Sequence, residues 1–99
     1  MQDRIYRKTA LLWASDKGHT DIVRLLVDAK ANVDMQEKHG MTALMGASVN
    51  GHTDIVRLLV DAKANVDVKN DNRNTALLWA SDKGHTDIVR LLTDAKAGA

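Results

Sequence analysis

Four histidines are the first residues to examine for chemistry, because the chain has no cysteine and therefore no thiolate nucleophile or thiolate zinc site. His19, His52 and His85 each follow a glycine and precede Thr-Asp, at equal spacing. If that spacing reflects stacked helices, the three side chains are about 8–10 Å apart, whereas nitrogen ligands lie about 2.0–2.1 Å from a shared zinc ion. We therefore predict structural histidines and no metal site, and we interpret His39 as a surface contact residue.

The other polar residues do not indicate catalysis either. Ser15, Ser48 and Ser81 are copies of one repeated position, and no glycine-rich phosphate motif is present. Fourteen Lys and Arg are interleaved with thirteen Asp and Glu, for a net charge of +1, so no basic stripe forms. We predict no enzyme activity, no cofactor, and no nucleic-acid or membrane partner.

Length and composition indicate one globular domain covering residues 1–99. The chain has a mass of 10.9 kDa, with 44% hydrophobic and 27% charged residues. Its longest apolar run, residues 10–14, is far shorter than a membrane span, and residues 1–8 lack the apolar region of a signal peptide. Together with the absence of cysteine, this predicts a cytoplasmic protein.

One segment of the sequence occurs three times. Residues 18–34 recur unchanged at 51–67, and recur at 84–97 with Thr93 in place of valine. Residues 9–17 recur at 75–83, with a variant at 42–50. The resulting offset of 33 residues gives units 4–36, 37–69 and 70–99. Copies this similar indicate recent duplication or deliberate assembly, and we favour an engineered chain.

Apolar residues in each unit have helical spacing. The first segment places Leu11, Ala14 and Ser15 on one face, opposite Trp13, Asp16 and Lys17. The second places Ile22, Leu25, Leu26 and Ala29 on one stripe, opposite Asp21, Arg24 and Asp28. Gly18 separates the two segments, and Thr20-Asp21 are expected to cap the second. Each unit is therefore predicted to be a helix, a tight turn, a helix and a loop.

The repeated pattern Thr-x-Leu-x-x-Ala-(Ala/Ser)-x-x-Gly-His-x-x-Ile-Val-x-Leu-Leu resembles the ankyrin repeat. The resemblance covers essentially the whole chain, in three units that share one register. It implies an all-α ankyrin-repeat solenoid of three helix–turn–helix units joined by β-hairpin-like loops.

The chain departs from the family pattern at several positions. The Thr-Pro-Leu-His signature reads Thr9-Ala10-Leu11-Leu12, and the other two units also lack the proline and the histidine. Lysines occupy the position of the glycine expected after the second helix, and arginines replace the turn glycine Gly40 in the flanking units. These residues are Lys30, Lys63, Lys96, Arg7 and Arg73. A left-handed backbone at such a residue costs about 1–2 kcal/mol relative to glycine, so we expect reduced stability with the same architecture.

Differences between the units gather at the loop tips and on the outward face of the first helix. In ankyrin-like folds these positions line the concave surface that binds protein partners. Drift at exposed sites is the alternative explanation. The predicted partner-binding residues are Tyr6, Lys8, Trp13, Asp16, Lys17, Lys38, His39, Met41, Gly46, Val49, Asn50, Asp71, Asn72, Asn74, Trp79, Asp82 and Lys83.

The two tryptophans mark the centre of this predicted surface. Trp13 and Trp79 lie opposite the predicted core, with Gly46 at the equivalent position between them. Exposed tryptophan is typical of interface hot spots, and glycine inside a helix costs about 1 kcal/mol relative to alanine. We expect an apolar notch over Gly46. The alternative is that the indoles pack laterally against Leu12 and Leu78.

The sequence leaves three functions open. The first is a non-catalytic module that binds a protein or peptide on its concave surface. The second is an engineered, consensus-like building block for folding or self-assembly without a natural ligand, and the third is a groove for a small ligand. The end units are near copies of the middle one, for example with Leu91 and Leu92 in place of Leu58 and Leu59. Apolar ends of this kind predict end-to-end self-association.

Overall fold

The computed structural model describes the backbone of residues 2–98 and the side chains of residues 10–98. Within that range the chain forms six helices and no strand. The helices are α1 (Gln2–Lys17), α2 (Thr20–Asp28), α3 (Ala43–Val49), α4 (Thr53–Asp61), α5 (Ala76–Asp82) and α6 (Thr86–Ala97).

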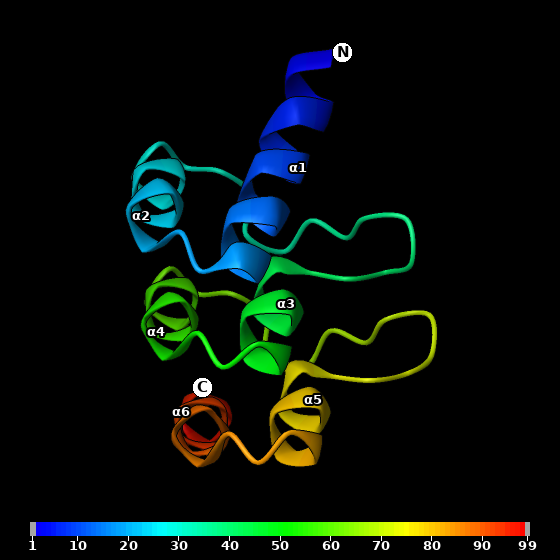
Figure 1. The fold of residues 1–99 in the computed structure, drawn as a ribbon, viewed down its shortest axis with the longest axis vertical. Coiled ribbons are helices and arrows are strands. Elements are labelled where there is room, and N and C mark those ends of the chain that lie inside the picture. Colours follow the sequence, from blue (N-terminus) through cyan, green and yellow to red (C-terminus); the bar gives the residue numbers. More distant parts are fainter. Residues whose placement is uncertain (1, 99) are drawn as a thin grey trace.

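The helices are stacked in two columns. Figure 1 shows α2, α4 and α6 above one another on one side and α1, α3 and α5 on the other, with two loops projecting beyond the second column. Each loop carries a hairpin-type hydrogen bond. The Glu37 amide donates to the Met41 carbonyl at 2.9 Å, and the Asn70 amide donates to the Asn74 carbonyl at 3.0 Å. This arrangement confirms the predicted all-α solenoid of three helical pairs.

The two kinds of helix begin differently. Thr42 and Thr75 cap α3 and α5, because their hydroxyl oxygens accept the amides of Met45 and Leu78, each at 3.2 Å. The expectation that Thr20-Asp21 would cap α2 was wrong. Thr20 is already the first helical residue, and the N-cap is His19, whose side chain makes no capping hydrogen bond.

Burial along the second helices depends on the position of the unit in the stack. The central helix α4 buries Ile55, Val56 and Leu59 completely, because it has a neighbour on each side. In α2 only Val23 is buried, and Ile22 and Leu25 are exposed. The predicted stripe on α2 was therefore wrong in detail, since it included the two exposed residues and missed the buried one.

The beginning of the chain differs from the predicted loop tip. Residues 5–8 were expected to form a loop like those of the other units, but they belong to α1. The loops of the second and third units support each other, since the Gln36 side chain donates to the Lys69 carbonyl at 3.0 Å. Within the described chain, residues 2–9 have no such loop on their outer side to support a loop conformation, and they are helical instead. The side chains of Tyr6 and Lys8 lie outside the described residues.

Among residues 2–98, three residues other than glycine have a left-handed backbone. Lys30 and Lys63 have φ of 68° and 70°, as expected for residues that replace the glycine after the second helix. Lys96 does not, because α6 continues through it to Ala97. Arg73 has φ of 67° at the position that Gly40 occupies in the preceding loop.

Candidate functional site

A cavity of about 320 Å³ lies beside Trp13, between the first two units. The Trp13 indole is half exposed and stacks against the His19 ring, with 4.8 Å between ring centroids. Leucine, methionine and tryptophan side chains form the apolar part of the wall, and two carboxylates stand at its polar part. The lining residues are Leu12, Trp13, Asp16, Glu37, Met41, Thr42 and Gly46.

Gly46 contributes to this cavity but is itself buried. A Cβ added there would lie 3.6 Å from the Asp16 Cα, so α1 closes over part of the expected notch. Asp16 thus covers part of the notch expected over Gly46, and the cavity that Gly46 lines is also lined by Met41 and Trp13. A distance of 3.6 Å is ordinary van der Waals contact, so a Cβ has room at this position and the spacing of α1 and α3 does not require glycine.

Asp16 is held in place at the edge of the cavity. Its carboxylate accepts a hydrogen bond from the Asn50 side chain at 2.7 Å, and its backbone carbonyl accepts a second one from the same amide at 3.1 Å. Asn50 also donates to the Gly46 carbonyl at 3.0 Å. Three of the predicted residues thus form one hydrogen-bonded group that joins the first unit to the second.

A second cavity, of about 340 Å³, lies beside Trp79 and is lined by Asn74, Leu78, Trp79 and Asp82. Trp79 is half-buried and packs against the core, and its indole N–H is buried without a hydrogen-bond partner. Trp79 is therefore partly packed against the core, whereas Trp13 is half exposed.

The remaining predicted residues whose side chains are described do not line either cavity. Exposed side chains at the loop tips are those of Lys38, His39, Asp71 and Asn72, and those at the ends of the first helices are Lys17, Asn50 and Lys83. Val49 is partly buried at the end of α3. Sequence reasoning missed Leu12, Glu37 and Thr42 as lining residues. The signal for Leu12 was its place next to Trp13, but nothing in the sequence placed Glu37 there.

The repeated histidines join neighbouring units. The imidazole Nε2 of His52 donates to the Asp16 carbonyl at 2.9 Å, and that of His85 donates to the Val49 carbonyl at 3.2 Å. These contacts confirm the structural role predicted for His52 and His85, whereas His19 stacks against Trp13 within the first unit. Within the described part of the chain, no three His, Asp or Glu side chains are grouped as metal ligands would be.

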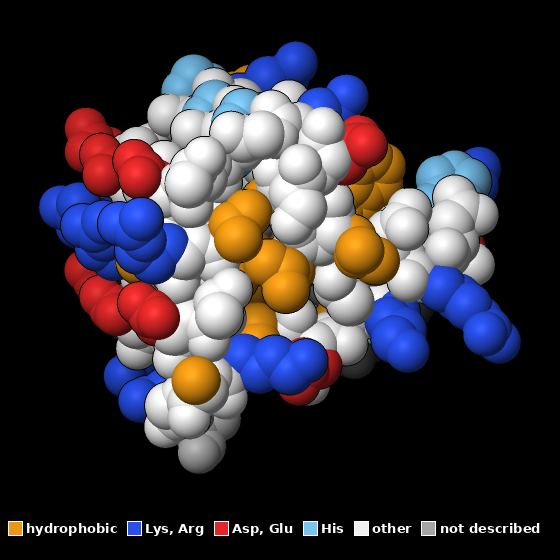
Figure 2. All heavy atoms as spheres, turned by 90° about the horizontal axis from the view of Figure 1, so that it is seen from below, with side chains coloured by type: hydrophobic (Ala, Val, Ile, Leu, Met, Phe, Trp, Pro, Cys, Tyr) orange, Lys and Arg blue, Asp and Glu red, His pale blue; other side chains and the backbone are white. Residues whose placement is uncertain are grey.

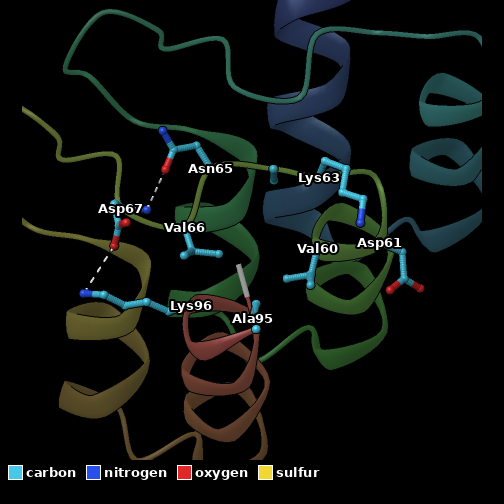
Figure 3. A pocket seen from close by; sticks show the side chains of 10 residues that line it. Val60, Asp61, Lys63, Asn65, Val66, Asp67, Ala95 and Lys96 are labelled. Carbon is cyan, nitrogen blue, oxygen red and sulfur yellow. Dashed lines mark hydrogen bonds and ion pairs between the residues drawn. The ribbon is translucent and has the colours of Figure 1, made fainter.

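A further cavity, of about 590 Å³, lies elsewhere, at the carboxyl ends of α4 and α6 (Figure 3). It forms where α6 runs on through Lys96 while α4 has already turned at Lys63. Lys96 reaches across to Asp67, with 3.4 Å between the amino and carboxylate groups, and both side chains remain largely exposed. The cavity is therefore a consequence of the greater length of α6, and none of the predicted contact residues lines it.

No helix among residues 2–98 has the length and apolar character needed to cross a membrane.

Comparison with known proteins agrees with the geometry. A search of curated proteins found no match. A profile for ankyrin repeats in three copies matches residues 1–70, and a single ankyrin-repeat profile matches residues 72–99. The chain therefore belongs to the ankyrin repeat family, whose members generally act as protein–protein interaction modules and are typically not enzymes.

Proposed function

We propose that this chain is a non-catalytic recognition module that binds a protein segment on the surface formed by its first helices and projecting loops. The observation that carries the proposal is the cavity beside Trp13, where a half-exposed indole and Met41 meet across about 320 Å³. Large, partly exposed aromatic side chains beside a cavity are common anchors of binding energy. Methionine adds an adaptable apolar wall that can fit different side chains.

The polar edge of this cavity supports an oriented contact. Asp16 and Glu37 line the cavity, and Lys17 is exposed next to Asp16 in the sequence. Charges of both signs at a rim contribute more to orientation and association rate than to affinity. The partner that fits is a segment with an apolar side chain for the cavity and polar groups on each side of it.

The distance between the two tryptophans favours an elongated partner. Trp13 and Trp79 are two units apart, which at about 8–10 Å per packed layer amounts to roughly 20 Å. A small molecule does not bridge such a distance, whereas a helix or a loop laid across the first helices does. The mixed-charge residues Asp82 and Lys83 would contact the far end of that segment.

Selection from a displayed library of random peptides supplies a partner for the test. Peptides selected on the parent chain would be titrated against Trp13→Ala, with Arg57→Ala on α4 as a control at an exposed residue away from the surface. Loss of a hot-spot indole costs at least about 2 kcal/mol, a roughly thirtyfold loss of affinity. We expect that loss for Trp13→Ala and parent-like binding for the control.

Gly46→Trp tests the same cavity in the opposite direction. The equivalent residues of the other two units are Trp13 and Trp79, so an indole at residue 46 is expected to displace the Asp16 side chain and to block the cavity, and circular dichroism checks that the variant folds. Selected peptides that bind both variants as tightly as the parent would contradict the proposed surface. The building-block alternative would then account better for the chain, since near-identical units are what such a use requires.

A further inference from the structure

Chemically identical residues have very different exposure at the ends and in the middle of the stack. Ile55 and Ile88 are fully buried, whereas their counterpart in the first unit, Ile22, is 41% exposed. The sequence around each isoleucine is the same. The difference in exposure therefore comes from the unit that packs against Ile55 and Ile88 on their preceding side, a contact that Ile22 does not have within residues 2–98.

The upper end in Figure 1 is the N-terminal end face, which we define by Trp13, His19, Ile22 and Leu25. Trp13 is 50% exposed and Leu25 is 69% exposed. Their counterparts in the third unit, Trp79, His85, Ile88 and Leu91, are buried or partly buried. Inside the stack the equivalent histidines bond to the preceding unit, whereas His19 stacks on Trp13.

The opposite end is the C-terminal end face, which we define by Leu78, Ser81, Asp82 and Val89. Leu78 is 53% exposed and Ser81 is exposed, although the matching residues of the second unit, Met45 and Ser48, are buried. Figure 2 views the molecule from this end and shows apolar side chains at its centre.

The structure already shows what covers a face of this composition. The C-terminal end face repeats the corresponding face of the first unit residue for residue, namely Leu12, Ser15, Asp16 and Val23. That face is covered by the second unit through α3 and α4, which present Gly46, His52, Ile55 and Leu58. We propose that a second copy of this chain covers it between molecules, so that copies stack head to tail in the register of the internal repeats.

Charge complementarity supports this occupant. In the internal interface Asn50 donates to the Asp16 carboxylate at 2.7 Å. In the same register between copies, Lys17 takes the place of Asn50 and Asp82 takes the place of Asp16. A lysine amino group thus meets a carboxylate at the position where the internal interface has an uncharged donor.

The indole of the incoming copy also has a place in this interface. Trp13 takes the position of Trp79, which the fold accommodates between α3 and α5 and whose N–H is buried without a partner. In the internal interface Asp16 lies 3.6 Å from a Cβ added at Gly46, and in the same register between copies Asp82 faces Trp13. Its carboxylate accepts the indole N–H that the internal interface leaves without a hydrogen bond.

Stacking in this register changes the beginning of the chain. Figure 1 shows the first turns of α1 rising beyond α2 on the side where the next copy docks. Residues 2–9 must therefore take the loop conformation that residues 35–42 and 68–75 have in the other units. Thr9 matches the capping residues Thr42 and Thr75, so the first helix then begins where α3 and α5 do.

Complementation between two single variants tests the proposal. Leu25→Asp disables the N-terminal end face and Leu78→Asp disables the C-terminal one; both residues are exposed, so the fold is retained. Asn65→Asp is the control, because it adds the same charge at an exposed residue of the middle unit, outside both end faces and the predicted partner-binding residues. Sedimentation velocity over a range of concentrations measures association, and circular dichroism checks folding.

We expect the parent and the control to form species larger than 10.9 kDa as concentration rises. Removing one buried leucine from the interface lowers the association constant about tenfold or more. Each variant alone therefore stays monomeric at concentrations where the parent has begun to associate. Mixed together, the two variants form a dimer and nothing larger, because each retains the face that the other lacks. A charge exchange, Lys17→Asp with Asp82→Lys, restores the association that either single change weakens.

Three outcomes would overturn the proposal. The first is a parent chain that remains monomeric at the highest concentrations. The second is a single variant that still forms dimers on its own, because such dimers indicate a symmetric contact between identical faces. Failure of the mixed variants to associate while the parent does would also contradict it. Peptide binding at Trp13 is measured on monomeric protein at low concentration, so the outcome for the proposed function is separate.

Discussion

Strain at single residues follows from the departures of this chain from its family pattern. Lys30, Lys63 and Arg73 have φ values of 68°, 70° and 67°, where a glycine has no Cβ to crowd the preceding carbonyl. Gly40 shows the unstrained solution at the position equivalent to Arg73. The chain therefore folds with several small and separate losses of stability.

Arg73→Gly is expected to raise the free energy of unfolding by up to about 1 kcal/mol, because the gain in the folded state exceeds the added flexibility of the unfolded chain. Lys63→Gly is expected to do the same. Lys96→Gly is the matched control, since Lys96 lies within α6 and glycine there lowers helix stability by up to about 1 kcal/mol. Urea denaturation of the three variants measures the difference. Equal shifts at all three positions would contradict the assignment of strain to the left-handed residues.

At the scale of the helices, the turn between the two helices of a unit links that unit to the next. Gly51 has φ of 77°, and a Cβ added there would lie 2.9 Å from the His85 ring of the following unit. The same ring donates to the Val49 carbonyl. Turn glycine and histidine thus form one packed contact between neighbouring helical pairs.

Gly51→Ala and Gly84→Ala separate the two costs of changing this glycine. Gly84 has nearly the same backbone, with φ of 75°, but no atom lies within 4 Å of an added Cβ. Gly84→Ala is therefore expected to lose only the backbone preference, about 1 kcal/mol, and Gly51→Ala to lose about 2–3 kcal/mol in total. Thermal unfolding of both variants measures the two losses. A Gly51→Ala loss no larger than that of Gly84→Ala would mean that the His85 contact contributes nothing.

For the whole molecule, the sequence predicted the features that every unit shares. It did not predict the burial of residues, which depends on the position of a unit in the stack. The offset of 33 residues gave the three helical pairs, and the lysines after the second helices revealed two left-handed residues. The exposure of Ile22 could not be read from its surroundings, because Ile55 has the same neighbours in sequence and is buried. Burial in a solenoid comes from adjacent units, which local patterns do not describe.

The candidate site was predicted in part for the same reason. Trp13, Asp16, Met41 and Gly46 were selected from differences between the units, and the structure places all four around one cavity. The size of the notch was misjudged, because helical periodicity does not show that Asp16 packs over Gly46. Glu37 was missed, since its place beside the cavity depends on the path of a loop.

The two tryptophans allow a direct measurement of whether a partner binds at the cavity beside Trp13. The chain has two indole N–H groups, which give two resolved signals in a nitrogen–proton correlation spectrum. Peptides selected on the parent chain would be titrated into labelled protein at low concentration, with Trp79→Phe assigning the signals. We predict that the Trp13 signal shifts in proportion to the bound fraction. Saturable binding that leaves the Trp13 signal unmoved would contradict the account.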